Sequence, residues 1–582
     1  MSDWLDFPPH VLREYALLAD GERGALCGPR GDIAWLCAPG WADSAVLSTL
    51  VGGRGSYSVS PAGPCVWGGY YEPGTLIWHN RWVTTNTVVE CREALAYPAD
   101  PRRVVLLRRI EAVERDVSVR VQLDLRDGFG GRSMRELSLG DDGVWTARTG
   151  DLRLRWRGAH AARPDDEGRL LLDVDLPGGT THDLVLEISP DHLPDPTDPN
   201  ALWAATEHTW HQAVPRLEDT VAPRDARHTY AVLRGLTTAA GGMVAAATLG
   251  LPERAEAGRN YDYRYVWLRD QCYAGLAASV TEGHPLLDDA VAFTSARLLE
   301  HGDRLLPAYR TDGRPPPEET PLRLPGYPGG NPIAGNHVRG QFQLDTLGEL
   351  LQLYAAAARH DRLTPDAERA ADLCVDLITR RWDQCEAGVW ELHNDWWTHS
   401  RLTCVAGLRA LAAQRSAASA AELSGLADRL LAETARRCTD HRGAWQRAPG
   451  LAGTDAALLL PPVRGALPAT DPRTIATLDA VHADLCEDGY VYRFAPDDCP
   501  LGEAEGAFLL CGFVMALARW HQGDGVGAFR WFERTRAACG PPGLLAEEYD
   551  VRQRQLRGNL PQAFVHALLL ETSHRLAHEP LS

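Results

Sequence analysis

Two carboxylate-bearing segments, far apart in the chain, carry residue types that could cleave a bond. Glu547 and Glu548 follow a Pro-Pro-Gly turn at residues 541–543. Because proline and glycine interrupt helices, these carboxylates are predicted to lie in a loop between helices. Glu391 lies much earlier, directly after Trp390. Hydrolysis of a glycosidic bond requires such a pair of separated carboxyl groups, one acting as acid and the other as base.

A third segment, residues 260–270, is dense in aromatic and charged side chains. Arg269 and Asp270 are adjacent, and Tyr263 and Trp267 come shortly before them. Charge-assisted hydrogen bonds from this pair, beside aromatic faces, could form a polar floor that binds the hydroxyls of a sugar. Capping of the helix that follows would equally explain Asp270, so both interpretations stay open.

Composition narrows the classes of partner. The 582 residues are 45% hydrophobic and 24% charged, which describes a globular protein rather than a disordered chain. With 59 basic and 78 acidic residues, the net charge of −19 disfavours nucleic acids and anionic membrane surfaces. The 18 tryptophans offer flat faces for stacking on sugars, although a single Trp more often belongs to the core. We expect a small carbohydrate or glycoside as the partner.

Targeting and metal-binding signals are not evident in the sequence. The opening residues lack a basic start and an apolar run of signal-peptide length, and no apolar stretch reaches the ~20 residues of a membrane span. We therefore expect a cytoplasmic protein. The 13 cysteines form no CxxC pair and no closely spaced His/Cys cluster, so we predict no metal site and no cofactor.

The periodicity of apolar residues changes along the chain. Between residues 15 and 188 apolar and polar residues alternate, most clearly in 117–125, which predicts an antiparallel β-sandwich. A Pro/Asp-rich break at 189–200 follows. Beyond it, about a dozen segments have a period near 3.6, which fits a toroid of paired helices better than a short bundle. The long loop at 305–337 is expected to flank a pocket.

Several sequence segments, each weak alone, form a specific pattern through their order along the chain. They cover residues 15–20, 31–37, 71–76, 260–270, 340–345, 388–391, 505–511 and 541–564. With them the chain resembles glycoside hydrolase family 15 in its bacterial, glucoamylase-like form. The resemblance implies an α+β multidomain fold, with a β-sandwich at 1–200, a helical linker at 201–225 and a catalytic (α/α)6 barrel at 226–582.

The same resemblance implies an inverting hydrolysis, without a metal, that releases a sugar from the non-reducing end of an α-linked substrate. Carried over by motif, Glu391 is the general acid and Glu547 the general base, with their carboxyl groups ~6.5–9.5 Å apart and one water between. We expect aromatic surroundings for the acid and a wet, polar loop for the base. Arg269 and Asp270 would grip the hydroxyls of the terminal sugar, and Tyr263 would stabilise developing positive charge.

Further residues are candidates for contact with substrate: Trp267, Gln343, Asp345, Trp390 and Glu548. Gln343 and Asp345 could equally be polar residues at the start of a helix. Glu548 is expected to order its loop or to bind a sugar hydroxyl rather than to perform the chemistry. Glu505, outside this set, precedes an apolar helical run and is expected to face the positive end of that helix.

Two departures from the family pattern concern the leaving group. The loop at 326–336 lacks the arginines that are common before its Gly-Asn sequence, and residues 399–401 read His-Ser-Arg where Tyr-Ser-Lys is usual. Both changes are expected on the leaving-group side of the pocket, where they would suit an unusual aglycone.

Our first hypothesis is an exo-acting α-glycosidase that releases glucose from short gluco-oligosaccharides. A trehalase of the same family would use the same residues for the first sugar, so it remains an alternative. A hydrolase-like enzyme that tailors a non-starch metabolite, or a catalytically silent sugar-binding protein, is the alternative of another class. The presence of both carboxylates favours an active enzyme.

Overall fold

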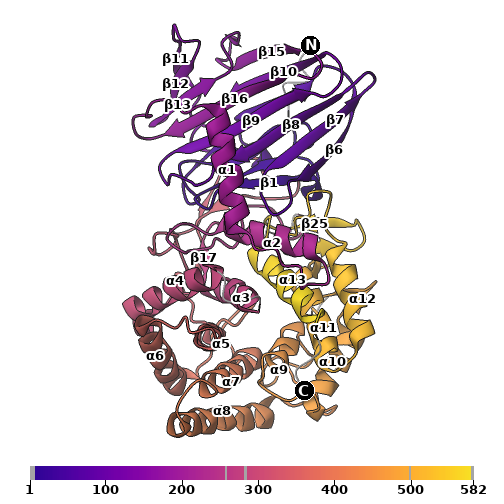
Figure 1. The fold of residues 1–582 in the computed structure, drawn as a ribbon. Helices are drawn as coiled ribbons and strands as arrows, with labels where there is room; N and C mark the ends of the chain where they lie inside the picture. Colours follow the sequence, from indigo (N-terminus) through magenta and orange to yellow (C-terminus); the bar gives the residue numbers. More distant parts are fainter. Residues whose placement is uncertain (1–6, 256–257, 281–284, 497–499, 579–582) are drawn as a thin grey trace.

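The computed structural model describes residues 7–255, 258–280, 285–496 and 500–578. Residues 1–6, part of the stretch in which we expect no signal peptide, lie outside this range. Figure 1 shows β-sheets in the first third of the chain and a ring of helices in the rest. The predicted order of a β-sandwich followed by an (α/α)6 barrel is confirmed. In the described ranges, no helix combines the length and apolar character needed to span a bilayer.

Two eight-stranded antiparallel sheets pack face to face in the N-terminal part. The first has the order β1-β2-β3-β5-β10-β15-β14, with β4 paired to β3. Its strands are β1 (Ala16–Ala19), β2 (Gly24–Cys27), β3 (Asp32–Cys37), β4 (Ala45–Leu47), β5 (Ser56–Pro61), β10 (Val117–Asp124), β14 (Arg163–Pro164) and β15 (Leu170–Leu176). The second has the order β11-β12-β13-β16-β9-β8-β7-β6. Its strands are β6 (Cys65–Tyr71), β7 (Trp78–Thr84), β8 (Val88–Leu95), β9 (Val104–Ala112), β11 (Arg135–Leu139), β12 (Trp145–Thr149), β13 (Leu152–Arg157) and β16 (Thr181–Ser189).

Alternating apolar residues build the core between these sheets. In β13, Leu152, Leu154 and Trp156 are buried, and the residues between them are more exposed. The opposite sheet supplies Tyr57, whose ring meets that of Trp156 edge to face at 5.9 Å. Because successive side chains of a strand point to opposite faces, the period of two read from the sequence is sufficient to define this core.

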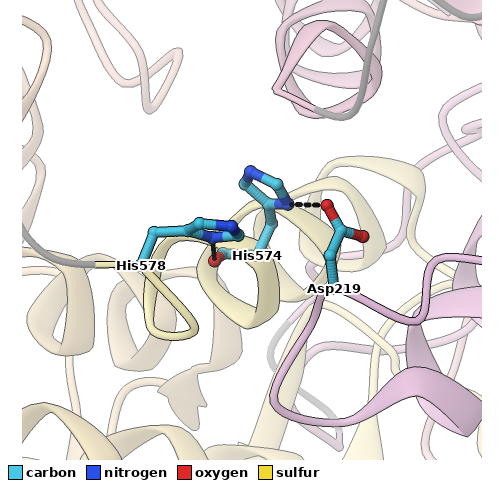
Figure 2. A group of neighbouring side chains, drawn as sticks. All are labelled: Asp219, His574 and His578. Atoms are coloured by element: carbon cyan, nitrogen blue, oxygen red, sulfur yellow. Dashed lines mark hydrogen bonds and ion pairs between the residues drawn. The ribbon is translucent and has the colours of Figure 1, made fainter.

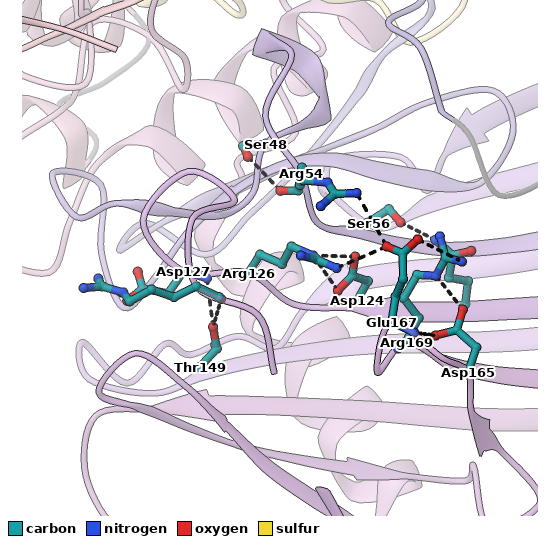
Figure 3. A network of polar contacts seen from close by, with 12 residues as sticks. Ser48, Arg54, Ser56, Asp124, Arg126, Asp127, Thr149, Asp165, Glu167 and Arg169 are labelled. Atoms are coloured by element: carbon teal, nitrogen blue, oxygen red, sulfur yellow. Dashed lines mark hydrogen bonds and ion pairs between the residues drawn. The ribbon is translucent and has the colours of Figure 1, made fainter. Parts of the chain in front are cut away.

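A network of arginines and carboxylates orders the loops at one edge of the sandwich (Figure 3). Arg126 Nε donates to Asp124 at 2.8 and 2.9 Å, and Arg169 Nε donates to Asp165 at 2.7 Å. Glu167 lies 3.8 Å from Arg126 and so joins the two pairs. The Arg126–Asp124 pair is largely buried, and Glu167 is 48% exposed. Because a buried ion pair must offset the cost of desolvation, we assign the network to fixing the loops rather than to a large gain in stability.

Helix α1 (Pro199–Ala213) runs from the sandwich toward the ring (Figure 1). Its start is defined by Asp198, which accepts from Ala201 N at 3.2 Å, and by Pro199 in the first turn. Trp203 and Trp210 bury one face of the helix. The connecting helix therefore begins two residues before the predicted linker at 201–225 and ends at Ala213, and residues 214–222 are not helical.

The ring has two layers of helices, which pair by contact into an (α/α)6 barrel. The inner layer is α3 (Leu268–Ser279), α5 (Leu344–Arg359), α7 (Thr398–Ala412), the short α9 (Leu460–Val463) with the 3-10 turn η6 (Ala456–Leu459) before it, α11 (Leu509–His521) and α13 (Ala563–Arg575). Contacts from α3 through α5, α7, α9, α11 and α13 back to α3 close the circle. The outer layer is α2 (Pro223–Leu236), α4 (Pro285–His301), α6 (Pro365–Arg381), α8 (Ala417–Cys438), α10 (Pro472–Asp484) and α12 (Gly525–Arg536).

Candidate active site

A cavity lies at the end of the ring where several inner helices begin. Its walls come from segments that precede α3, α7, α11 and α13. Because the first turn of a helix carries unpaired N–H groups and the positive end of its dipole, this end of the ring favours anionic groups. Seven of the ten predicted site residues line the cavity: Tyr263, Trp267, Arg269, Asp270, Trp390, Glu391 and Glu547.

Glu391 sits on an unusual backbone. Its φ is +55°, in the left-handed region that non-glycine residues rarely adopt, and its N–H donates to Gly388 O at 3.3 Å. Such strain costs on the order of 1–3 kcal/mol and is concentrated at functional sites. The carboxylate accepts from Trp267 Nε1 at 2.8 Å and lies 3.5 Å from Arg269 Nη2. Both contacts are to Oε1.

Arg269 and Asp270 lie in the first turn of α3, beside Glu391. Arg269 Nη1 donates to Val389 O at 3.1 Å, and its Nε lies 3.4 Å from Asp270 Oδ1. Burial raises the pKa of Asp270 to about 6, against the opposing charge of Arg269. The N-cap of α3 is Trp267, so Asp270 does not occupy the capping position that the sequence left open.

Glu547 lies in a buried wall of the same cavity, with only 6% of its surface exposed. The expected wet loop is therefore wrong, because a short sheet formed around β24 (Glu548–Asp550) and the ring of Tyr263 cover this carboxyl group. Tyr263 Oη donates to both carboxylate oxygens, each at 3.2 Å. Burial, and next the charge of Glu253, raise the pKa of Glu547 well above its ordinary value.

Glu253 is a site residue that the sequence analysis missed. It lines the cavity, is 5% exposed, and its carboxyl group neighbours that of Glu547. Both carboxyl groups surround Gly558, whose missing Cβ would lie 3.5 Å from Glu547 Oε2 and 3.8 Å from Glu253 Cγ. Two buried carboxyl groups this close repel each other when both are ionised, so the pair favours a state in which one of them keeps its proton. No motif marks Glu253 in the sequence beyond its position after Pro252.

Two arginines stabilise the acidic wall behind Glu253. Arg493 pairs with Glu505 at 2.5 Å and lies 3.8 Å from Glu548, and Arg259 donates to Glu505 at 2.8 Å. Burial disfavours the ionised form of Glu505, but Arg493 and Arg259 hold its pKa below the ordinary value. The expectation that Glu505 serves the helix dipole is therefore wrong, because its carboxylate is held by two guanidinium groups.

Three predicted residues are buried behind the cavity lining rather than in it: Gln343, Asp345 and Glu548. Gln343 Oε1 accepts from Arg269 Nη1 at 3.4 Å, so it supports Arg269 from behind. Burial raises the pKa of Asp345 to about 6, again against the charge of Arg269. Glu548 accepts from Gly506 N at 2.8 Å, which agrees with the expectation that it orders its loop.

The residues that depart from the family pattern take different positions. The long loop does flank the cavity, through Asn336 and His337. His399 and Arg401 lie inside α7 and are not among the residues that line it. Arg401 forms a fully buried ion pair with Glu386 at 2.9 Å. Arg401 therefore stabilises the base of the loop that carries Glu391, and the triplet does not line the cavity. Its expected place on the leaving-group side stays a prediction.

Trp390 forms part of one wall. Its Nε1 donates to Asp455 at 2.8 and 3.0 Å, and its ring meets Phe508 edge to face at 5.0 Å. The guanidinium of Arg493 lies 5.3 Å from its ring centre. These contacts fix the ring from the side of η6 and α11, so Trp390 can serve as a rigid aromatic surface for a sugar.

The sandwich holds the segment that carries Tyr263 and Trp267. Arg264, buried between the two parts, pairs with Asp262 at 2.8 Å and donates to Trp41 O at 3.1 Å and to Asp43 O at 2.8 Å. Trp35 Nε1 also donates to Ala247 O at 2.8 Å, next to this segment. The N-terminal part therefore positions one wall of the cavity.

Together, the ring of paired helices and a cavity with separated carboxyl groups, aromatic walls and an arginine define a glycoside hydrolase. A model of "Glycosyl hydrolases family 15" matches residues 227–574, and a model of "Trehalase-like, N-terminal" matches residues 5–154. The chain belongs to glycoside hydrolase family 15, as its motifs predicted.

Relatives and solved structures agree with this assignment. The trehalase of Mycobacterium tuberculosis is 28% identical over 97% of this chain and 89% of its own length. Trehalase 1 of Sulfolobus acidocaldarius is 30% identical over 68% of this chain and 71% of its own length. The isomaltose glucohydrolase of Kribbella flavida is 28% identical over 59% of this chain and 83% of its own length. A crystal structure of a bacterial glucoamylase complexed with acarbose matches 99% of this chain and 97% of that chain, with a TM-score of 0.70 and 12% identity, and so supports the fold.

Proposed function

We propose that this protein hydrolyses an α-glucosidic bond with inversion of configuration, with Glu391 as general acid and Glu547 as general base. The observation that carries the proposal is that both carboxyl groups line one cavity and are joined by a line of aromatic contacts. Trp267 donates to Glu391, its ring lies 5.5 Å from that of Tyr263, and Tyr263 donates to Glu547. A separation of ~6.5–9.5 Å between the two groups would leave room for the attacking water.

In this mechanism the terminal sugar lies against Arg269 and Asp270. Glu391 Oε2 gives a proton to the glycosidic oxygen as the bond to the anomeric carbon breaks. Glu547 takes a proton from a water that attacks that carbon from the opposite face, so the first product has inverted configuration. Both protons are accounted for, because the acid loses the one that the leaving group gains and the base gains the one that water loses.

A proton retained by the Glu253–Glu547 pair bears on the role of the base. A general base must be ionised, and Tyr263 stabilises the ionised form of Glu547 by donating to both of its oxygens. The proton therefore resides on Glu253 in the active form of the enzyme.

Arg269 lies next to the general acid. Its contact with Val389 O fixes the loop that carries Glu391.

Trehalose is the substrate that we propose first. Support comes from the relatives named trehalase, two of which match 97% of this chain, and from the trehalase-like N-terminal model. Other short α-linked glucosides are the second candidate, because the chain is also similar to an isomaltose glucohydrolase.

The products distinguish these possibilities. Purified protein is incubated separately with trehalose, isomaltose, maltose and maltotriose, and the anomers first released are followed by proton NMR. Inverting hydrolysis of trehalose yields one α-glucose and one β-glucose per turnover, whereas retention yields α-glucose alone. Initial release of only α-glucose would contradict inversion, and no turnover of any of the four would favour a tailoring enzyme or a silent sugar-binding protein.

A further inference from the structure

Two histidines and an aspartate meet at the far end of α13 (Figure 2). His574 lies in the last turn of α13, and His578 follows one turn later. Asp219 lies in the segment between α1 and α2. One potential ligand atom from each side chain lies within 4.8 Å of the other two. Asp219 is distant from the histidines in sequence, so spacing alone could not have predicted this group.

The contacts of the two rings leave nitrogen lone pairs for a ligand. His578 Nδ1 lies 2.8 Å from His574 O, and because a carbonyl oxygen only accepts, this nitrogen carries a proton and Nε2 has the lone pair. A backbone carbonyl is a usual partner for the second nitrogen of a metal-binding histidine. His574 Nδ1 is buried and finds no hydrogen-bond partner in the part of the chain that the structure describes, although Asp219 Oδ2 is only 3.4 Å away.

We propose that Asp219, His574 and His578 form a binding site for a divalent transition-metal ion. Two imidazoles and one carboxylate suit Zn²⁺, Ni²⁺, Co²⁺ or Cu²⁺, whereas Mg²⁺ and Ca²⁺ prefer oxygen ligands alone. Ligand atoms about 2.0–2.2 Å from a shared ion lie closer together than 4.8 Å, so binding draws the three side chains inward. Asp219 is 55% exposed and His578 lies on the surface, so both can make this movement, and water completes the coordination.

The ion would join the last inner helix to the linker. The same two segments are already in contact, since Val221 N donates to Ser573 O at 2.9 Å and Ala222 N donates to Ser573 Oγ at 3.2 Å. Trp520 Nε1 donates to His578 O at 3.1 Å and fixes the residue after the helix. Because an ion bound only by the folded chain stabilises it, the expected effect is on stability. The 13 residues of α13 separate this site from the catalytic cavity by about 20 Å, so hydrolysis is expected to be independent of it.

The site is tested on the full chain after treatment with a chelator and its removal. Zn²⁺ is titrated by calorimetry into the wild type, His578→Ala and Asp219→Asn, and the melting temperature is measured with and without Zn²⁺. The matched control is the double variant His208→Ala/His211→Ala, which removes two exposed histidines three residues apart on α1. Hydrolysis by all variants is measured in metal-free buffer as a check of folding.

We expect one Zn²⁺ per chain at the highest affinity, at least tenfold weaker binding in His578→Ala and Asp219→Asn, and unchanged binding in the control. Zn²⁺ should raise the melting temperature of the wild type and the control more than that of the two site variants. Binding that is equally strong in His578→Ala, or binding that is lost in the α1 control, would overturn the proposal.

Discussion

Glu253 and Glu547 place two buried carboxyl groups side by side in the wall of the cavity, where ionisation of one opposes ionisation of the other. Around them, Glu505 and Glu548 bring the number of neighbouring carboxyl groups to four, against the two guanidinium groups of Arg259 and Arg493. Burial raises the pKa of Glu253 and of Glu547. This wall therefore retains a proton at a pH where exposed carboxylates have lost theirs. The loss of that proton is expected to appear in the pH dependence of hydrolysis.

Replacement of either proposed catalytic carboxyl group should abolish turnover without unfolding the protein. Glu391→Gln and Glu547→Gln keep the shape of the side chain but remove the proton donor and the proton acceptor, respectively. We expect each to lower kcat by about 10²-fold or more, which is the usual contribution of a positioned acid or base. The measurement is glucose release, with circular dichroism as the check of folding. Near wild-type turnover in either variant would remove that residue from its role.

Glu253→Gln should shift the pH profile to lower pH while activity is retained. The charge of Glu253 is the second cause, after burial, of the raised pKa of Glu547, so a neutral amide lowers that pKa. A base that ionises at lower pH extends kcat/KM on the acidic side. The measurement is kcat/KM from about pH 4 to 9, with exposed Glu422→Gln on α8 as the control. Loss of activity as complete as in Glu547→Gln would instead make Glu253 itself the base.

Tyr263→Phe should shift the same profile in the opposite direction. The phenol donates to both oxygens of Glu547 and so favours its ionised form. Without that hydroxyl the pKa of Glu547 rises, and the acidic limb of kcat/KM moves to higher pH. The ring, which packs against Trp267, is kept, so the shape of the wall should not change. An unshifted acidic limb would show that this hydrogen bond does not control the ionisation of the base.

The sequence predicted elements whose burial follows a simple period. Alternating apolar residues at 152–156 and the spacing of Leu423, Leu426 and Leu430 each predict one buried face, and the strand β13 and the outer helix α8 have it. The spacing of Leu344, Leu347 and Leu351 likewise predicts one buried face, but the inner helix α5 is surrounded by others and is buried on nearly all sides, including Asp345 and Glu349. Periodicity detects a boundary between core and solvent, and an inner helix of a two-layer ring has none.

The site could be predicted where aromatic and charged residues are concentrated in one segment, as in residues 260–270. Glu253, Arg259 and Arg493 come from loops without a period or motif, and only the fold brings them together behind Glu547. The wrong prediction of a wet loop around Glu547 has the same origin. A loop between helices suggested a wet carboxylate, whereas strand pairing of β24 with its neighbours buries it.

The buried glutamate of α5 should make stability depend on pH. Glu349 is 1% exposed, one of its oxygens makes no hydrogen bond within the described chain, and burial raises its pKa from 4.5 to about 8. The unfolded chain loses this proton near pH 4.5 and the folded chain near pH 8, so the free energy of unfolding falls as pH rises between these values. The slope from this one group is at most about 1.4 kcal/mol per pH unit.

Glu349→Gln mimics the protonated form and should remove this loss of stability at high pH. Its free energy of unfolding, measured with urea at pH 9, should therefore exceed that of the wild type. The control, Glu422→Gln at an exposed position, should have the stability of the wild type at every pH. If the stability of Glu349→Gln depends on pH as that of the wild type does, Glu349 is not the group that retains the proton.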